Sequence, residues 1–256
     1  MVFGKRLGNA LISNLLEKRG YCLKETALPP AGFKKFLDFY KSFAPYPKTV
    51  IDIGVGNGTP WLYEGFSNSR LVLFEALTEF KPSIDRILET REGTCNYCAL
   101  SERDGTLEIH VPNSGSTGAS ILERNADWAA LKAARGDKGI SKRSIPAHRL
   151  DGIVGDVQGP YVIKIDVEGA ELHVLRGGEK TASGADMIIV EASIATRHTG
   201  ESDLTDIAAY LKTLGFALFD IIEMAPIRRG GPLAYVDAAF IRKDADFYTK
   251  AVFDNV

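Results

Sequence analysis

The chain has 256 residues, of which 45% are hydrophobic and 25% are charged, and its formal net charge is -2. This length and composition fit one large soluble domain with a substantial core. The near-neutral charge provides no global field that would favour nucleic acid or an anionic membrane surface. No apolar stretch approaches the roughly 20 residues of a membrane-spanning helix, and no secretory signal is recognisable. We therefore expect a cytoplasmic protein without an integral membrane segment, whose oligomeric state the sequence does not indicate.

Three cysteines are present, Cys22, Cys95 and Cys98. A low and odd number is typical of proteins in a reducing compartment. Cys95 and Cys98 have C-x-x-C spacing, but no second pair of metal ligands accompanies them, and residues three apart in a strand point to opposite faces. We therefore do not expect a zinc or redox site at these positions.

Residues 1–47 are predicted to form a helical segment that packs on the core and is interrupted at Pro29-Pro30. Beyond it, residues 48–256 are expected to form a single domain in which strands and helices alternate. The first strands are predicted over 49–53, 70–74 and 94–100, with helices near 59–66 and 78–90. This alternation implies right-handed crossovers and a parallel sheet.

Residues 101–160 interrupt the alternation and are interpreted as an insertion. The pattern predicts a strand over 106–111, a loop over 113–120, a helix over 121–134 and a polar loop over 136–144. An insertion of this length is either a lid or substrate-selecting wall, or a surface excursion. The sequence leaves both interpretations open.

The alternation then resumes, with strands predicted over 161–166 and 186–190 and helices over 169–176 and 203–214. Two consecutive strands follow without a helix between them, over 216–222 and 233–242. Because a short loop joins them, we expect a terminal antiparallel pair.

A glycine-rich turn, Asp52-Ile-Gly-Val-Gly-Asn-Gly58, follows the first strand of this domain. Its spacing is G-x-G-x-G and differs from the G-x-G-x-x-G of dinucleotide binding, which serves a pyrophosphate. Such a turn suits a nucleoside that carries an amino acid, such as S-adenosylmethionine. Glu75 ends the next strand, where an acidic residue can bind the ribose hydroxyls.

A cluster of charge marks the junction between the strand over 161–166 and the following helix, in the segment Lys164-Ile-Asp-Val-Glu-Gly-Ala-Glu171. Buried charge is costly unless it is paired or used. The carboxyl ends of parallel strands are also where open α/β folds place their ligands. Strand alternation puts Lys164 and Asp166 on one face, opposite Ile163 and Ile165.

These elements together resemble the FkbM family of S-adenosylmethionine-dependent methyltransferases. The resemblance covers roughly residues 48–242, and its most specific part is the segment from Lys164 to Glu171 followed by Val174-Leu-Arg-Gly177. Supporting segments occur in the expected order: Val50–Gly54, Leu73–Ala76, Ala99–Ser101, Arg149–Asp151, Ile189–Glu191 and Val236–Phe240. One departure lies at the helix entry, where Trp61 alters the expected pocket around the methionine end of the cofactor.

The resemblance implies an α/β, Rossmann-like class I methyltransferase fold, with a seven-stranded mixed sheet that ends in an antiparallel hairpin. It also implies O-methylation of a hydroxyl on a small molecule or glycan, such as a sugar or a natural product. S-adenosyl-L-methionine is the expected cofactor. The residues expected to bind it are Asp52, Gly54, Gly56, Asn57, Glu75, Ala76, Leu100 and Asp166.

The expected catalytic residues are Asp166, Glu168, Glu191 and His198, because a sugar hydroxyl is a poor nucleophile and benefits from a general base. Glu168 is interpreted either as a site residue or as a favourable charge at the helix N-terminus. Glu191 could join Asp166 in holding a divalent cation, but three scattered carboxylates are no ligand signature, so a metal is not favoured. His198 is a candidate base because it follows a strand end and because histidine is the side chain that most often serves as a general base.

Other charges are given structural interpretations. Glu171 is expected on the helix surface or as a partner of Lys164. Arg197 and Arg228-Arg229 could meet an anionic acceptor, but the default interpretation is solvated loop charge. Two further functions remain open: an oxidoreductase that uses a nicotinamide cofactor, and a non-catalytic binding module on a methyltransferase fold. The glycine spacing argues against the first, and the intact turn and acidic residues argue against the second.

Overall fold

The computed structural model describes residues 32–228 and 230–253. The predictions for residues 1–31, which include Cys22 and the interruption at Pro29-Pro30, and the prediction for Arg229 lie outside the described residues. Within the described part of the predicted N-terminal segment, helix α2 covers Phe33–Lys41 and buries Phe36, Leu37 and Tyr40.

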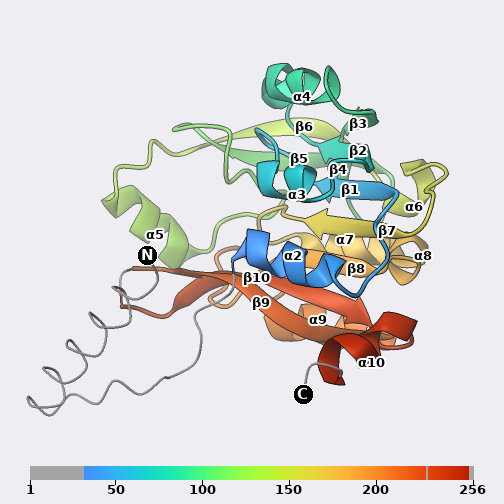
Figure 1. Ribbon diagram of the computed structural model, residues 1–256. Coiled ribbons are helices and arrows are strands. Elements are labelled where there is room, and N and C mark those ends of the chain that lie inside the picture. Colours follow the sequence, from blue (N-terminus) through green and yellow to red (C-terminus); the bar gives the residue numbers. More distant parts are fainter. Residues whose placement is uncertain (1–31, 229, 254–256) are drawn as a thin grey trace, which may run out of the picture. The chain divides into compact units, whose positions relative to one another are not determined.

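A seven-stranded mixed sheet forms the centre of the domain (Figure 1). Its order is β3 (Gly93–Tyr97), β2 (Arg70–Glu75), β1 (Thr49–Ile53), β7 (Tyr161–Ile165), β8 (Met187–Ser193), β10 (Leu233–Arg242) and β9 (Phe216–Pro226). The neighbours from β3 to β8 are parallel, whereas β10 is antiparallel to both β8 and β9. This arrangement confirms the predicted fold class and its C-terminal antiparallel hairpin.

Helices cover both faces of this sheet, which explains why the inner parallel strands β2, β1, β7 and β8 are almost entirely buried, whereas the edge strand β3 is partly exposed. One face packs against α2, α3 (Pro60–Gly65) and α4 (Lys81–Leu88), the last preceded by the short helix η1 (Thr78–Phe80). The other face packs against α6 (Leu150–Ile153), α7 (Glu171–Gly177), α8 (Glu179–Ser183) and α9 (Leu204–Thr213). Helix α10 covers Asp246–Phe253. Among the described helices, none combines the length and apolar character that crossing a bilayer requires.

The insertion contributes a second, three-stranded sheet in the order β4 (Ala99–Leu100), β6 (Ile140–His148), β5 (Gly105–Pro112), together with helix α5 (Ala126–Ala134). Strand β5 confirms the prediction for 106–111. The polar loop predicted over 136–144 is wrong from Ile140 onward, because that segment pairs along its whole length with β5. The polar residues belong to a half-buried strand, in which Ile145 and Ala147 are buried and the positions between and immediately before them are exposed. Because so many of its residues are polar, its sequence resembles that of a loop.

The strand predicted over 94–100 is divided between the two sheets. Residues up to Tyr97 extend the central sheet beside β2, whereas Ala99 and Leu100 pair with β6 of the small sheet. Cys98 at the division is buried, and both described cysteines are free. The division places Ala99 and Leu100 at the carboxyl ends of the central strands, beside the glycine turn.

Candidate active site

The glycine turn after β1 closely approaches the end of β7. Gly54 has φ 82°, and a Cβ at this position would lie 1.7 Å from the backbone oxygen of Asp166. Only glycine permits both the left-handed conformation and this close approach. The turn is therefore held directly against the loop that carries Asp166.

Glu75, at the end of β2, organises the other side of the turn. One of its carboxylate oxygens accepts a hydrogen bond from the backbone N–H of Gly56 at 2.7 Å, and the other accepts from the N–H of Leu77 at 2.8 Å. Burial raises the pKa of Glu75, while these backbone donors act in the opposite direction. Each oxygen retains a lone pair, so the carboxylate can still accept hydrogen bonds from hydroxyl groups of a ligand.

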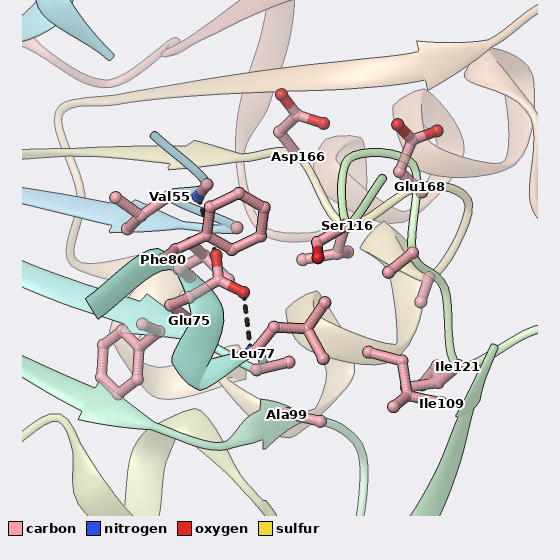
Figure 2. A pocket seen from close by; sticks show the side chains of 18 of the residues that line it. Val55, Glu75, Leu77, Phe80, Ala99, Ile109, Ser116, Ile121, Asp166 and Glu168 are labelled. Carbon is pink, nitrogen blue, oxygen red and sulfur yellow. Dashed lines mark hydrogen bonds between the residues drawn. The ribbon is translucent and has the colours of Figure 1, made fainter. Parts of the chain in front are cut away.

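A cavity of about 310 Å³, here called the glycine-turn cavity, opens over these residues (Figure 2). Its wall includes most of the residues that the sequence predicted for the cofactor: Gly54, Gly56, Asn57, Glu75, Ala76, Leu100 and Asp166. Phe80, Ala99 and Ile109 make much of the remaining wall apolar. Figure 2 shows Asp166 and Glu168 on the side of the cavity opposite Ile109 and Ile121.

Asp52, also predicted to contact the cofactor, does not reach the wall of this cavity. Its carboxylate is fully buried beneath the turn, where it accepts hydrogen bonds from the hydroxyls of Thr59 at 2.8 Å and Tyr63 at 2.5 Å. Burial raises the pKa of Asp52, although nearby Lys164 acts to lower it. The structure thus places Asp52 where it fastens helix α3 to strand β1.

Lys164 on β7 is buried and donates a hydrogen bond from Nζ to an Asp166 carboxylate oxygen at 2.8 Å. Burial works to lower the pKa of Lys164, but the carboxylates of Asp166 and Asp52 raise it above its ordinary value. The ammonium therefore remains charged and orients Asp166.

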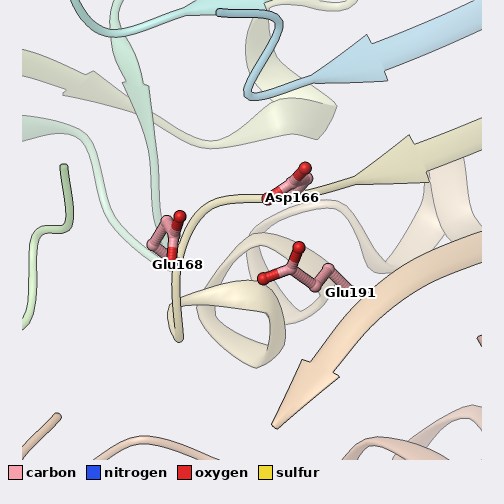
Figure 3. Close-up of side chains that lie close together, drawn as sticks. All are labelled: Asp166, Glu168 and Glu191. Carbon is pink, nitrogen blue, oxygen red and sulfur yellow. The ribbon is translucent and has the colours of Figure 1, made fainter. Parts of the chain in front are cut away.

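The structure brings together three of the four predicted catalytic residues. Asp166, Glu168 and Glu191 each place a carboxylate oxygen within 4.8 Å of the other two (Figure 3). Burial, together with the charges of Asp166 and Glu168, raises the pKa of Glu191 to about 9. This oxygen set could hold a divalent cation. Protein cations already compensate it, however, because Lys164 pairs with Asp166 and Arg197 pairs with the two glutamates.

Arg197 occupies the centre of this charge network, so its interpretation as a solvated loop charge is wrong. The residue is only 6% exposed, and its guanidinium nitrogens lie 3.1 Å from Glu168 and 3.3 Å from Glu191. Glu201, which is also buried, lies 3.8 Å from Arg197 Nε and accepts a hydrogen bond from the Arg197 backbone N–H. The burial of Arg197 is tolerated because its guanidinium group pairs with several carboxylates at once.

The loop between β7 and α7 turns sharply through two residues with positive φ, Glu168 at 54° and Gly169 at 100°. Glu168 does not cap α7, whose N-cap is Ala170, and its side chain lines the glycine-turn cavity instead. The expectation of an exposed Glu171 is wrong. Its side chain is buried, and it accepts hydrogen bonds from the N–H groups of Val167 at 3.2 Å and Gly169 at 2.9 Å.

His198, the fourth predicted catalytic residue, is not brought to the cavity wall. It is buried behind the loop at Gly169, and its Nδ1 lies 3.6 Å from a carboxylate oxygen of Glu201. Its backbone N–H donates to Glu201 at 2.8 Å. In this position His198 supports the Arg197 segment, and the structure gives it no direct path to an acceptor hydroxyl.

A second cavity, of about 280 Å³, adjoins the first and is here called the acidic cavity. Both cavities are lined by Gly54, Val55 and Asp166. The remaining wall combines carboxylates, one lysine and aromatic rings: Glu191, Glu223, Asp237, Lys164, Phe33, Trp61 and Tyr235 are among its residues. Asp166 is therefore the charged residue at which the two cavities meet.

Comparison with protein families matches residues 52–218 to the methyltransferase FkbM domain. The matched region contains the glycine turn, Glu75, Asp166 and Glu191, and it spans well over half of the chain. The chain belongs to the FkbM methyltransferase family. This membership confirms the resemblance found in the sequence and, at the level of the family, the expectation of S-adenosylmethionine as cofactor.

Comparison with solved structures returns methyltransferases at low sequence identity and low structural similarity. A magnesium protoporphyrin IX methyltransferase from Synechocystis PCC 6803 with bound SAH is 12% identical, with a TM-score of 0.44 and coverage of 82% of each chain. A TehB-like SAM-dependent methyltransferase from Corynebacterium glutamicum is 11% identical, with a TM-score of 0.35 and coverage of 94% of this chain and 99% of that one. Comparison with curated proteins yields no match.

Sequence reasoning missed several wall residues of the FkbM domain. Asp237 lies within a segment that supports the family resemblance, yet sequence reasoning gave it no role in the site. Glu223 belongs to a strand that extends to Pro226, beyond its predicted end at residue 222. Ser116 to Ala119, together with Ile109 and Ile121, bring the insertion to the glycine-turn cavity, so this part of it is more than a surface excursion.

Proposed function

We propose that this FkbM methyltransferase is an O-methyltransferase that transfers a methyl group from S-adenosylmethionine to a hydroxyl on a sugar or natural-product acceptor. The observation that carries the proposal is the position of Asp166 at the meeting point of the two cavities. One cavity suits the nucleoside of the cofactor, and the adjoining one has room for a small polar acceptor.

The residues of the glycine-turn cavity fit the cofactor chemically. Glu75 offers carboxylate lone pairs to ribose hydroxyls, while the walls from Phe80, Ala99 and Leu100 suit an adenine ring. When bound, S-adenosylmethionine supplies a methyl group on a positively charged sulfur. The backbones of Gly54 and Asp166 lie close together where the two cavities meet. This fixed junction favours alignment of the methyl group of the cofactor with the hydroxyl of the acceptor.

Asp166 is assigned the role of general base at the acceptor oxygen. Lys164 is the hydrogen-bond donor to its carboxylate within the described residues, and it leaves the second oxygen available. That oxygen takes the hydroxyl proton as the acceptor oxygen forms its bond to the methyl carbon. Glu191 and Glu168 lie behind Asp166 and both form ion pairs with Arg197, which fixes their side chains next to the proposed base.

The proposal is tested by calorimetry with S-adenosylhomocysteine, followed by a screen of hydroxyl-bearing sugars and natural products in which release of S-adenosylhomocysteine is measured. We expect micromolar binding of the cofactor product and turnover with hydroxyl acceptors, the methyl group appearing on oxygen by mass spectrometry and NMR. A protein that binds NAD but not S-adenosylhomocysteine would overturn the cofactor assignment. Methyl transfer to nitrogen or carbon alone would overturn the assignment of O-methylation.

A further inference from the structure

Three carboxylates form a row across neighbouring strands on the wall of the acidic cavity. Glu191 on β8 lies opposite Asp237 on β10, and Asp237 lies opposite Glu223 on β9. All three line the cavity. Like charges at directly opposed positions of adjacent strands destabilise a sheet. When its carboxylates are ionised, this row of three therefore destabilises the folded sheet.

Asp237, at the centre of this acidic row, has no partner to neutralise it. Its side chain is 7% exposed, and no described residue donates a hydrogen bond to it or forms an ion pair with it. Glu223 is an exposed residue at the rim of the cavity and forms no ion pair with a described residue, whereas Glu191 is paired with Arg197. Lys164 is the basic residue on the described wall of this cavity, and its Nζ already donates to Asp166. Burial and the nearby charge of Asp166 raise the pKa of Asp237 to about 7, so near neutral pH this carboxyl group is neutralised either by a proton or by a cation that enters the cavity.

Aromatic rings complete the same wall. Trp61 and Tyr235 both line the cavity, and the Trp61 ring stacks on Phe33 with a centroid distance of 4.0 Å. The Arg197 guanidinium lies over the Tyr235 ring at 5.0 Å from its centroid, so an organic ammonium group would be attracted by the remaining faces of the two rings. A cavity of about 280 Å³ is also far larger than one metal ion needs, and it suits a ligand of the size of a sugar ring.

A metal ion explains the acidic row less well than an ammonium group. The carboxylates close enough to share an ion are Asp166, Glu168 and Glu191, and Asp237 is not among them. That group is already paired with Lys164 and Arg197, as described above. The uncompensated charge lies instead at Asp237 and Glu223, beside the aromatic rings.

We propose that the acidic cavity binds a protonated amine of the acceptor, so that the acceptor is an alcohol that also carries an ammonium group, such as an amino sugar. This inference rests on the proposed function, because the cavity reaches the cofactor side at Asp166. The amine would lie against Asp237 and Glu223, and a neighbouring hydroxyl would face Asp166. The cofactor also carries an ammonium group on its methionine end, so the experiment must separate the two sources.

The experiment uses calorimetry on the full chain saturated with S-adenosylhomocysteine, with methyl glycosides of 2-amino, 3-amino and 4-amino sugars as probes. Each probe is matched with its neutral hydroxyl counterpart and with its N-acetylated form, which removes the charge. We expect at least one amine to bind about tenfold more tightly than both neutral partners. Asp237→Asn and Glu223→Gln should each reduce this preference severalfold. Glu89→Gln, at the exposed C-cap of α4 and part of neither cavity wall, should preserve it.

The outcomes separate the possible explanations. Equal binding of amine and neutral partners, or no amine binding at millimolar concentration, overturns the inference. If Asp237→Asn and Glu223→Gln weaken binding of S-adenosylhomocysteine itself and leave amine preference unchanged, the ammonium belongs to the cofactor, and the inference also fails. Tight binding of Mg²⁺ alone that these variants abolish would replace the amine by a metal. None of these outcomes bears on O-methylation, because that proposal fails only if the wild-type protein does not bind S-adenosylhomocysteine or transfers the methyl group only to nitrogen or carbon.

Discussion

Individual side chains at this site combine two tasks, holding the backbone and presenting an oxygen to a ligand. Glu75 shows this most clearly, because its carboxylate spans Gly56 and Leu77 while facing the glycine-turn cavity. Asp166 also has two contacts of different kinds, because it accepts a hydrogen bond from the side chain of Lys164 and lines both cavities. Substitution of either residue should therefore affect the ligand more than the fold.

We expect Glu75→Ala to weaken binding of S-adenosylhomocysteine by about tenfold to a hundredfold. The variant loses the carboxylate that accepts from Gly56 and, in the proposed complex, from the ribose. Calorimetry measures the affinity, and circular dichroism shows whether the fold is kept. A folded Glu75→Ala protein with wild-type affinity would contradict the ribose assignment.

We expect Asp166→Ala to lose methyl transfer by about a hundredfold or more while the protein folds and still binds S-adenosylhomocysteine. The loss follows from removal of the base at the acceptor oxygen. Single-turnover measurement of methyl transfer checks it, with Glu89→Gln as the control that should keep wild-type activity. Full activity of the alanine variant would exclude Asp166 as the base.

At the scale of the elements, the loop between β7 and α7 depends on a buried acid rather than on an ordinary helix cap. Glu171 is 1% exposed, and burial raises its pKa to about 8, although its backbone hydrogen bonds and those of Gly169 and Val167 oppose the shift. The folded protein therefore holds a proton that the unfolded chain releases above the ordinary pKa of 4.5. This group makes the free energy of unfolding fall as the pH rises from about 4.5 to about 8, beyond which the effect levels off.

We expect Glu171→Gln to remove this dependence, because a neutral amide can keep the hydrogen bonds from Val167 and Gly169 without a titrating proton. Between pH 5 and pH 8, the free energy of unfolding should fall by about 3 kcal/mol less in the variant than in the wild type. Urea unfolding at the two pH values measures the difference. The exposed control Glu89→Gln should retain the wild-type dependence, and an unchanged dependence in Glu171→Gln would show that Glu171 is already ionised in the folded state.

At the scale of the whole molecule, the insertion and the central sheet build one site. The hydroxyl of Ser120 donates to the backbone oxygen of Glu168 at 2.7 Å, which ties the insertion to the loop that carries Asp166. The neighbouring residues from Ser116 to Ala119 line the glycine-turn cavity. Binding of the cofactor should therefore restrict the motion of this part of the insertion, although it is distant in sequence from the glycine turn.

We expect S-adenosylhomocysteine to slow amide hydrogen exchange severalfold in residues 114–119, because the bound ligand restricts opening of this loop. Exchange mass spectrometry with and without the ligand measures the effect. The C-terminal residues 243–250, which line neither cavity, serve as the internal control. Unchanged exchange in 114–119 at saturating ligand would show that the loop does not close over the cofactor.

The sequence by itself determined the order of strands and helices, the glycine turn, Glu75 and the charged segment from Lys164 to Glu171, because these depend on local periodicity and on motifs of adjacent residues. It misjudged Arg197, Glu171 and the strand from Ile140 to His148, since the burial of a polar residue is decided by partners distant in the chain. Only the tertiary structure joined Asp166, Glu168 and Glu191, and aligned Glu191, Asp237 and Glu223 across three strands. The physical reason is register: pairing between strands sets which side chains become neighbours, and a single sequence does not state it.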